Sequence, residues 1–232
     1  MDEPTFVVVV EPVRLDGGSV LHIQAPHVPP FYLLTAKSYR DKAEPLRLRT
    51  ITSTRAEPDG SLRPHDAKAA FDAIEGLTIA VILSAAAIEA HANDMIRRLD
   101  DEATIEAERR GKPVIYDRSS MERGLSLEEK LTLVGPLLTG TVSIKGTTAW
   151  EAFRRVVPLR NDLLHVKSPA VAENDPDNPS PYGRLLLGAG STAPEDAARV
   201  IHAVEPGWIP KEVATQLGII PDQNGRDLNS RK

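Results

Sequence analysis

The chain has 232 residues, of which 41% are hydrophobic and 26% charged, so extensive disorder is not expected and the length suits one sizeable domain with appendages. It contains no cysteine, which excludes disulfides, thiolate metal sites and a cysteine nucleophile. The formal net charge of −5 argues against coating nucleic acid by bulk electrostatics, but it leaves room for one local basic pocket.

The N-terminal segment, residues 1–62, is expected to form a β-rich arm or a small sheet. Its strand candidates are residues 6–10, 20–23, 31–34 and 46–51, and residues 16–18 are a turn signal. Because an isolated hairpin is marginal in water, we expect this arm to pack on something larger.

Residues 63–205 are expected to form a helical bundle. No proline occurs between Ala67 and Arg110, and apolar residues recur there at alternating spacings of three and four, which predicts one long amphipathic helix. The predicted buried stripe is Phe71, Ile74, Thr78, Val81, Ala85, Ile88, Ala92, Met95 and Leu99. Such a helix has to bury its stripe against other helices or a partner chain.

A second helix is predicted to begin at Ser126, because Ser126 and Glu129 match the pattern of a capping box. This helix is expected to end at Leu133 or at Leu138. A third helix is predicted to begin near Thr147.

A fourth helix is predicted over residues 194–204, with Pro194 in its first turn. Between the third and fourth helices, residues 169–191 are rich in Pro, Gly and Asn and are expected to form a long loop. Residues 206–232 are expected to be a C-terminal tail that is frayed at its end.

The third helix contains an arginine where its spacing calls for an apolar residue. The positions on its predicted stripe are Trp150, Phe153, Val157, Arg160 and Leu164. Burying a guanidinium without a partner is costly. We therefore expect a protein carboxylate or a ligand phosphate against Arg160.

His165 follows Arg160 by five positions, about 140° around an ideal helix, so the two side chains do not share a face of a straight helix. They can meet one ligand from the two flanks of a groove, or where the helix ends or is distorted between them. Pro158 either kinks the helix or starts a new one, and both alternatives are open.

Residues 160–165, Arg-Asn-Asp-Leu-Leu-His, resemble the Arg-x(4–6)-His motif of the HEPN superfamily, in the form in which asparagine follows the arginine. The surroundings are also similar to bacterial HEPN proteins, with residues 84–90 on a long helix, residues 126–131 opening the next helix, and two aromatic residues before the motif. The resemblance covers residues 66–205.

This resemblance implies a mainly α protein with a HEPN-like bundle of four or five helices, which dimerises so that two motifs meet in a cleft. It implies a metal-independent endoribonuclease without cofactors, such as a toxin or phage-defence effector, in which an RNA 2′-hydroxyl attacks the phosphate and leaves a 2′,3′-cyclic phosphate. His165 would take the 2′-proton, Arg160 would hold the phosphate and Asn161 would orient either group. The implied partners are RNA, a second copy of the chain and a cognate antitoxin protein.

Two polar residues on the long helix, Glu89 and Asn93, lie four positions apart beside its apolar stripe. They are expected either to reach the cleft and position the motif or to be boundary residues with ordinary contacts. An ion pair between Glu89 and Arg160 is the structural alternative to phosphate binding. His91 and Asp94 on the same helix are expected at the surface.

A second functional hypothesis shares the same bundle: a non-catalytic HEPN dimer that serves as a binding or assembly module. In this hypothesis His165 is a helix C-terminal residue that interacts with the helix dipole. The acidic start of the chain and the lack of an apolar run of about 20 residues predict a soluble cytoplasmic protein without membrane contact.

Overall fold

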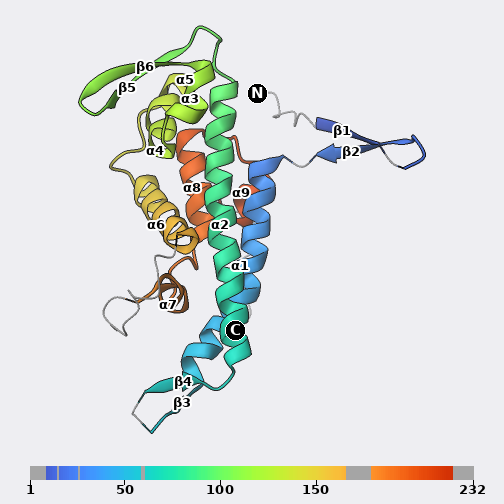
Figure 1. Ribbon diagram of the computed structural model, residues 1–232, viewed down its shortest axis with the longest axis vertical. Coiled ribbons are helices and arrows are strands. Elements are labelled where there is room, and N and C mark those ends of the chain that lie inside the picture. The colour runs from blue at the N-terminus through green and yellow to red at the C-terminus, as the bar shows by residue number, and fades with distance from the viewer. Residues whose placement is uncertain (1–8, 15, 26, 59–60, 166–178, 222–232) are drawn as a thin grey trace.

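Helix α2 (Ala67–Arg97) is the central element of the computed structural model, and the other long helices pack along it (Figure 1). The structure describes residues 9–14, 16–25, 27–58, 61–165 and 179–221. The other helical segments are α1 (Val28–Thr52), α3 (Arg118–Gly124), α4 (Leu127–Glu129), the π-helical turn η1 (Lys130–Val134), α5 (Gly135–Thr139), α6 (Thr148–Leu164), α7 (Pro181–Leu186), α8 (Ala193–Val204) and α9 (Lys211–Gln216). The strands form antiparallel hairpins, β1 (Val9–Arg14) with β2 (Val20–Ala25), β3 (Thr54–Ala56) with β4 (Leu62–Pro64), and β5 (Thr104–Arg109) with β6 (Lys112–Asp117). The described chain is mainly α-helical, as expected, with small two-stranded sheets.

The long helix that the sequence predicts is confirmed in its central part. Asp66 caps α2, since its side chain accepts a hydrogen bond from the Ala69 N–H at 2.9 Å. From Val81 onward the predicted stripe is buried. Near the start of the helix the predicted stripe is wrong, because Phe71 is 72% exposed.

The predicted end of this helix near Arg110 is wrong, because α2 ends at Arg97 and the β5–β6 hairpin follows. In β5 the side chains alternate, with Ile105 and Ala107 buried and the residues beside them exposed or half-buried. An alternation with a period of two is that of a strand with one buried face. Arg110 and Gly111 both have positive φ and make the tight turn.

The strands predicted at residues 31–34 and 46–51 are also wrong, because both segments lie in α1. Pro29 is compatible with this helix because it lies in the first turn, where a backbone N–H is not needed. α1 runs along α2 at close range: a Cβ added at Gly76 would lie 2.8 Å from the Cβ of Ala43. Packing against α2 therefore overrides the strand propensity of these apolar segments.

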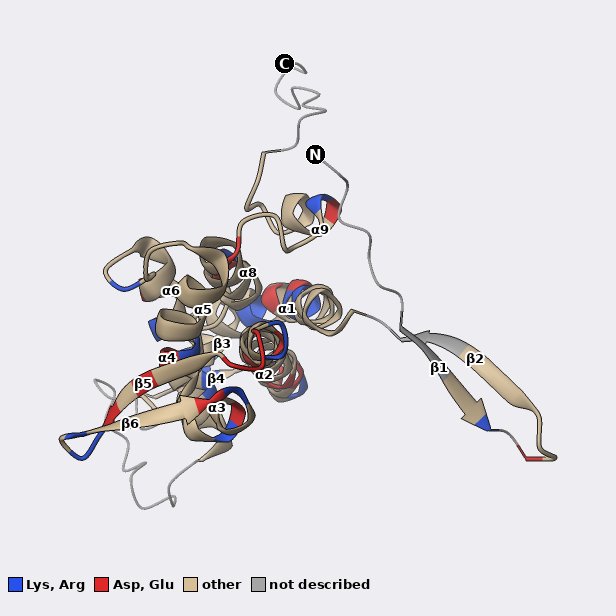
Figure 2. Ribbon diagram, turned by 90° about the horizontal axis from the view of Figure 1, so that it is seen from above, with Lys and Arg blue, Asp and Glu red and all other residues tan. Residues whose placement is uncertain are grey.

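The predicted N-terminal hairpin is confirmed for the residues that the structure describes. β1 and β2 pair in antiparallel register, with Val13 opposite Leu21. Residues 6–8 of the predicted first strand lie outside the described residues. The expectation that this hairpin packs on something larger is wrong for the described residues, because the hairpin points away from the helices in two perpendicular views (Figures 1 and 2) and leaves Val13, Val20 and Leu21 exposed.

The predicted capping box is confirmed. The Ser126 hydroxyl accepts a hydrogen bond from the Glu129 N–H at 3.3 Å, and the Glu129 carboxylate accepts one from the Ser126 N–H at 2.8 Å. The helical path that starts there continues through η1 and α5 to Thr139, close to the longer of the two predicted ends.

In the C-terminal part, α8 occupies the predicted residues and has Pro194 in its first turn. The predicted loop 169–191 is wrong over residues 181–186, which form α7, and the predicted tail contains α9. Residues 169–178 of the loop and 222–232 of the tail lie outside the described residues.

Helix α2 contains a longer apolar stretch than the sequence analysis expects for any segment of the chain. By length and composition this helix could cross a membrane, with a mean hydropathy of 1.8 over its most apolar window. Half of that window is buried inside the protein, where α2 contacts α1, α6 and α8. A core helix passes the same composition test, so α2 is compatible with a soluble protein.

Candidate functional site

Helix α6 carries the predicted motif. It begins after Thr147, as predicted, and the Thr147 hydroxyl accepts a hydrogen bond from the Trp150 N–H at 3.3 Å. The helix runs through Pro158 to Leu164, so a restart at Pro158 is excluded. The predicted stripe is displaced by about one position, because the buried residues are Ala149, Ala152, Phe153, Val156, Leu159 and Leu163. Arg160 therefore lies at the edge of the buried face and does not interrupt it.

The anionic partner expected for Arg160 is Glu89 on α2. Their Nη2 and Oε2 atoms are 3.2 Å apart, with the Arg160 side chain 22% exposed and the Glu89 side chain 50% exposed. Solvent screens an ion pair this accessible, so a ligand phosphate can replace the carboxylate at modest cost. The contact is the predicted ion pair, and it also orients the guanidinium.

Asn93, one turn after Glu89, contacts a residue that sequence reasoning did not single out. Its side-chain oxygen accepts a hydrogen bond from Lys130 Nζ at 2.8 Å. Lys130 is buried at the start of η1. The sequence signal at Lys130 is its place in residues 126–131, which indicate a helix start and no chemistry.

His165 and Asn161 lie at the open end of α6. His165 is the C-cap, with φ −117° and ψ 48°, which are outside helical values. Its backbone N–H donates to the Asn161 carbonyl at 2.9 Å, and both side chains are exposed. The helix thus ends between Arg160 and His165, one of the arrangements that lets both reach the same ligand.

The next helix lies beside the motif. Asp162 is exposed, as expected, and its carboxylate accepts a hydrogen bond from Arg184 of α7 at 2.5 Å. This ion pair brings α7 to the end of α6. Three apolar side chains are exposed at or near this contact, Leu164 (51%), Tyr182 (40%) and Leu187 (72%).

His91 is fully buried, so the expectation of a surface position is wrong. Its ring lies 4.3 Å from the Trp208 ring, measured between centroids, and its Nε2 is 3.8 Å from Oε2 of Glu205. Burial lowers the pKa of His91 to about 4, although the negative charge of Glu205 opposes this shift. The spacing did contain a signal, since His91 follows Ile88 by three positions on the buried side of α2.

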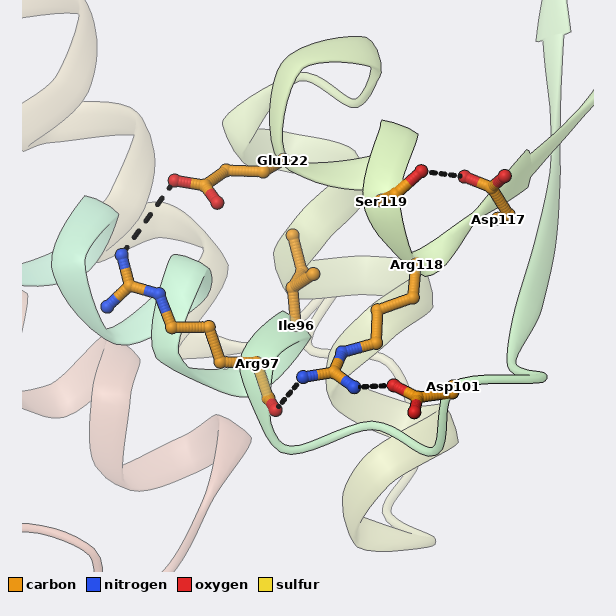
Figure 3. A pocket seen from close by; sticks show the side chains of 7 residues that line it. All are labelled: Ile96, Arg97, Asp101, Asp117, Arg118, Ser119 and Glu122. Carbon is orange, nitrogen blue, oxygen red and sulfur yellow. Dashed lines mark hydrogen bonds and ion pairs between the residues drawn. The ribbon is translucent and has the colours of Figure 1, made fainter.

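Two pockets among the described residues lie away from the motif. The larger, about 480 Å³, is at the C-terminal end of α2, and its lining residues are Ile96, Arg97, Asp101, Asp117, Arg118, Ser119 and Glu122 (Figure 3). Its guanidinium groups face protein acceptors: Arg118 binds Asp101 and the Arg97 carbonyl, and Arg97 lies 3.8 Å from Glu122. The smaller lies between α1 and α2. Neither is lined by Arg160, Asn161 or His165; of these, Asn161 and His165 are exposed and Arg160 is half-buried.

Within the described ranges, no three His, Asp or Glu side chains are grouped so that they could hold a metal ion. Comparison of the chain with protein-family models, with curated proteins and with solved structures finds no match.

Proposed function

We propose that the chain is a metal-independent endoribonuclease of HEPN type. One observation carries the proposal: the last turn of α6 presents Arg160, Asn161 and His165 at its solvent-accessible end, with Glu89 of α2 against the arginine. A histidine that can act as a base and an arginine that can bind an anion thus lie five residues apart at a helix end. A polymer such as RNA can reach an open site of this kind.

His165 supplies the base in this proposal. A neutral imidazole accepts a proton near pH 7. As the 2′-oxygen attacks phosphorus, its proton passes to the imidazole and the bond from phosphorus to the 5′-oxygen breaks. The products are a 2′,3′-cyclic phosphate and a 5′-hydroxyl, and the 5′-oxygen takes its proton from water or from an imidazolium.

Arg160 stabilises the charge on the phosphate. Its guanidinium offers two parallel N–H donors to the phosphate oxygens as the charge develops. Glu89 holds the guanidinium before the substrate arrives, and the phosphate then takes the place of the carboxylate. In this proposal Asn161, four positions before His165, orients the imidazole or the substrate by hydrogen bonding.

A second copy of the chain completes the site in this proposal. On one chain the motif is open to water, whereas two facing motifs form a cleft that excludes water. Exposed apolar side chains beside the motif, Leu164, Tyr182 and Leu187, favour an interface on this side. In this proposal the enzyme acts in the cytoplasm as a toxin or phage-defence effector, and an antitoxin protein inhibits it.

The second candidate is a non-catalytic HEPN dimer that acts as a binding or assembly module. The contact between Arg160 and Glu89 favours it, because an arginine committed to a protein carboxylate is a structural residue.

Cleavage of varied single-stranded RNAs in EDTA separates these candidates. Wild type is expected to cut, and His165→Ala and Arg160→Ala are each expected to lose about 100-fold in rate or more. His22→Ala and Arg154→Ala remove exposed residues of the same types on β2 and α6 and should leave the rate unchanged. Equal rates for wild type and His165→Ala, or no cleavage by wild type, would contradict the proposed nuclease and favour the binding module.

A further inference from the structure

Lys130 is a buried cation outside the motif, and it contacts Asn93, one turn along α2 from the glutamate that pairs with Arg160. It is 6% exposed, and its Nζ donates hydrogen bonds to the Asn93 side-chain oxygen at 2.8 Å and to the Glu122 carbonyl at 2.7 Å. Both acceptors are uncharged. Among the described residues, the carboxylates that act on the ammonium charge, those of Glu89 and Glu122, do so at longer range.

Keeping this charge buried works against stability. Burial lowers the pKa of Lys130, and the carboxylates of Glu89 and Glu122 oppose that shift. The Glu122 carboxylate also faces Arg97 at 3.8 Å, which leaves Glu89 as the carboxylate on the motif side. A buried ammonium in such surroundings is less stable than an apolar side chain of similar length.

The backbone at Lys130 is also unusual. Lys130 is the first residue of the π-helical turn η1, which follows the capped start of α4. Single π-helical turns within α-helices are frequent at functional sites, because the wider turn changes the direction of the side chains. Lys130 thus combines a buried charge, which lowers stability, with the first position of a π-helical turn.

Glu89 links Lys130 to the motif. α2 places Glu89 and Asn93 one turn apart, with Arg160 of α6 on the first and Lys130 of η1 on the second. Figure 1 shows α6 and the α4–α5 segment on the same side of α2. Since Glu122 faces Arg97, the charges that remain are the two positive ones of Lys130 and Arg160 and the negative one of Glu89, which leaves one positive charge. A phosphodiester carries the matching single negative charge.

We propose that Lys130 is a positioning residue for phosphodiester binding at Arg160: it fixes Asn93 and attracts the Glu89 carboxylate, which weakens the hold of Glu89 on the guanidinium. The ligand class is a single-stranded polynucleotide backbone. This inference rests on the proposed function, because it concerns what Arg160 binds. Without Lys130, Glu89 pairs fully with Arg160 and the ligand has to break that ion pair.

Binding of a 2′-O-methyl RNA oligonucleotide tests the inference, because this probe has no free 2′-hydroxyl and is not cut. Fluorescence anisotropy at low salt is expected to show about tenfold weaker binding for Lys130→Met, but less than about a twofold change when the same substitution is made in a Glu89→Gln background. A merely structural role for Lys130 would not be relieved by Glu89→Gln. Lys145→Met removes an exposed lysine before α6 and should bind like wild type.

The outcomes separate this inference from the proposed function. Wild-type affinity in Lys130→Met, or an equal loss in both backgrounds, overturns the role of Lys130 while cleavage by wild type still supports the nuclease. Absence of both binding and cleavage in wild type overturns both. If Lys130→Met fails to fold, Lys130→Gln, which keeps a donor without the charge, is compared in the same two backgrounds.

Discussion

Among the described residues, neither ring nitrogen of His91 has a hydrogen-bond partner, although the side chain is fully buried. The nearest carboxylate, Glu205, is held by Arg98 at 2.6 Å, so much of its charge is already compensated. Burial accordingly dominates and lowers the pKa of His91 to about 4. The folded protein keeps this imidazole neutral at pH values where an exposed histidine is charged.

Lowering the pH should therefore destabilise the fold through His91. Between the ordinary pKa of 6.5 and the folded-state pKa of about 4, the unfolded chain binds a proton at His91 and the folded chain does not. The free energy of unfolding falls in this window by up to about 1.4 kcal/mol per pH unit, or about 3 kcal/mol altogether. Urea unfolding across this range should show a steeper loss for wild type than for His91→Leu. Parallel slopes would show that another group carries the effect.

For individual side chains, the sequence predicts the partner of a charged residue more reliably than it predicts which residues are buried. The ion pair between Arg160 and Glu89 is present as one of the sequence alternatives has it, although Arg160 lies at the edge of the buried face of α6 and not on the predicted apolar stripe. His91 was assigned to the surface, and Lys130 was not singled out. The contact between Lys130 and Asn93 joins residues 37 positions apart, and spacing within one helix contains no information on which element packs against it.

The close contact between helices α1 and α2 depends on Gly76. An alanine there gains helix propensity of up to about 1 kcal/mol, but its Cβ would lie 2.8 Å from the Cβ of Ala43. Overpacking of this kind costs about 1–3 kcal/mol. We expect Gly76→Ala to lose about 1 kcal/mol of unfolding free energy in chemical denaturation.

Ala43→Gly removes the atom that the new methyl group meets, so the double variant should recover part of the loss despite its second glycine. A double variant that is less stable than the sum of the two single changes would contradict the close approach of the helices.

Local start signals support two of the helices that the sequence predicts, but a signal of the same kind at Ser180 and Pro181 starts α7 within the predicted loop. Ser126 and Glu129 mark the start of α4, and Pro194 marks α8. α1 also has a proline, Pro29, in its first turn, but the apolar side chains of residues 31–34 and 46–51 suit a strand or a helix, and packing against α2 selects the helix. The predicted helix extends too far beyond Arg97, because the charged residues that follow are compatible with an exposed helix end as well as with a hairpin.

Removal of the N-terminal hairpin and removal of α1 should have different effects on the fold. A chain without residues 1–25 loses the projecting hairpin and should melt at the wild-type temperature. A chain without residues 1–62 also loses α1, which exposes the face of α2 that α1 covers, and should unfold or aggregate. Circular dichroism and size-exclusion chromatography measure both. A folded, monodisperse chain beginning at Arg63 would contradict the role of α1 in the core.

The proposed second copy makes a separate prediction about assembly. Leu164→Glu places a charge among the exposed apolar side chains beside the motif, so it should reduce the dimer mass in light scattering and the RNA cleavage rate together. Val142→Glu changes a side chain that is 85% exposed before α6 and serves as the control. A monomeric wild type that cleaves RNA at full rate would show that one chain is sufficient.

Whether His165 takes the proton of an RNA 2′-hydroxyl is tested most directly by the end group left on RNA cut in EDTA. Wild type should leave a 2′,3′-cyclic phosphate and a 5′-hydroxyl, the same sequence with 2′-O-methyl groups should stay intact, and His165→Ala should give no product above background. Products ending in a 3′-hydroxyl, or the cyclic product formed at the wild-type rate by His165→Ala, would contradict the claim.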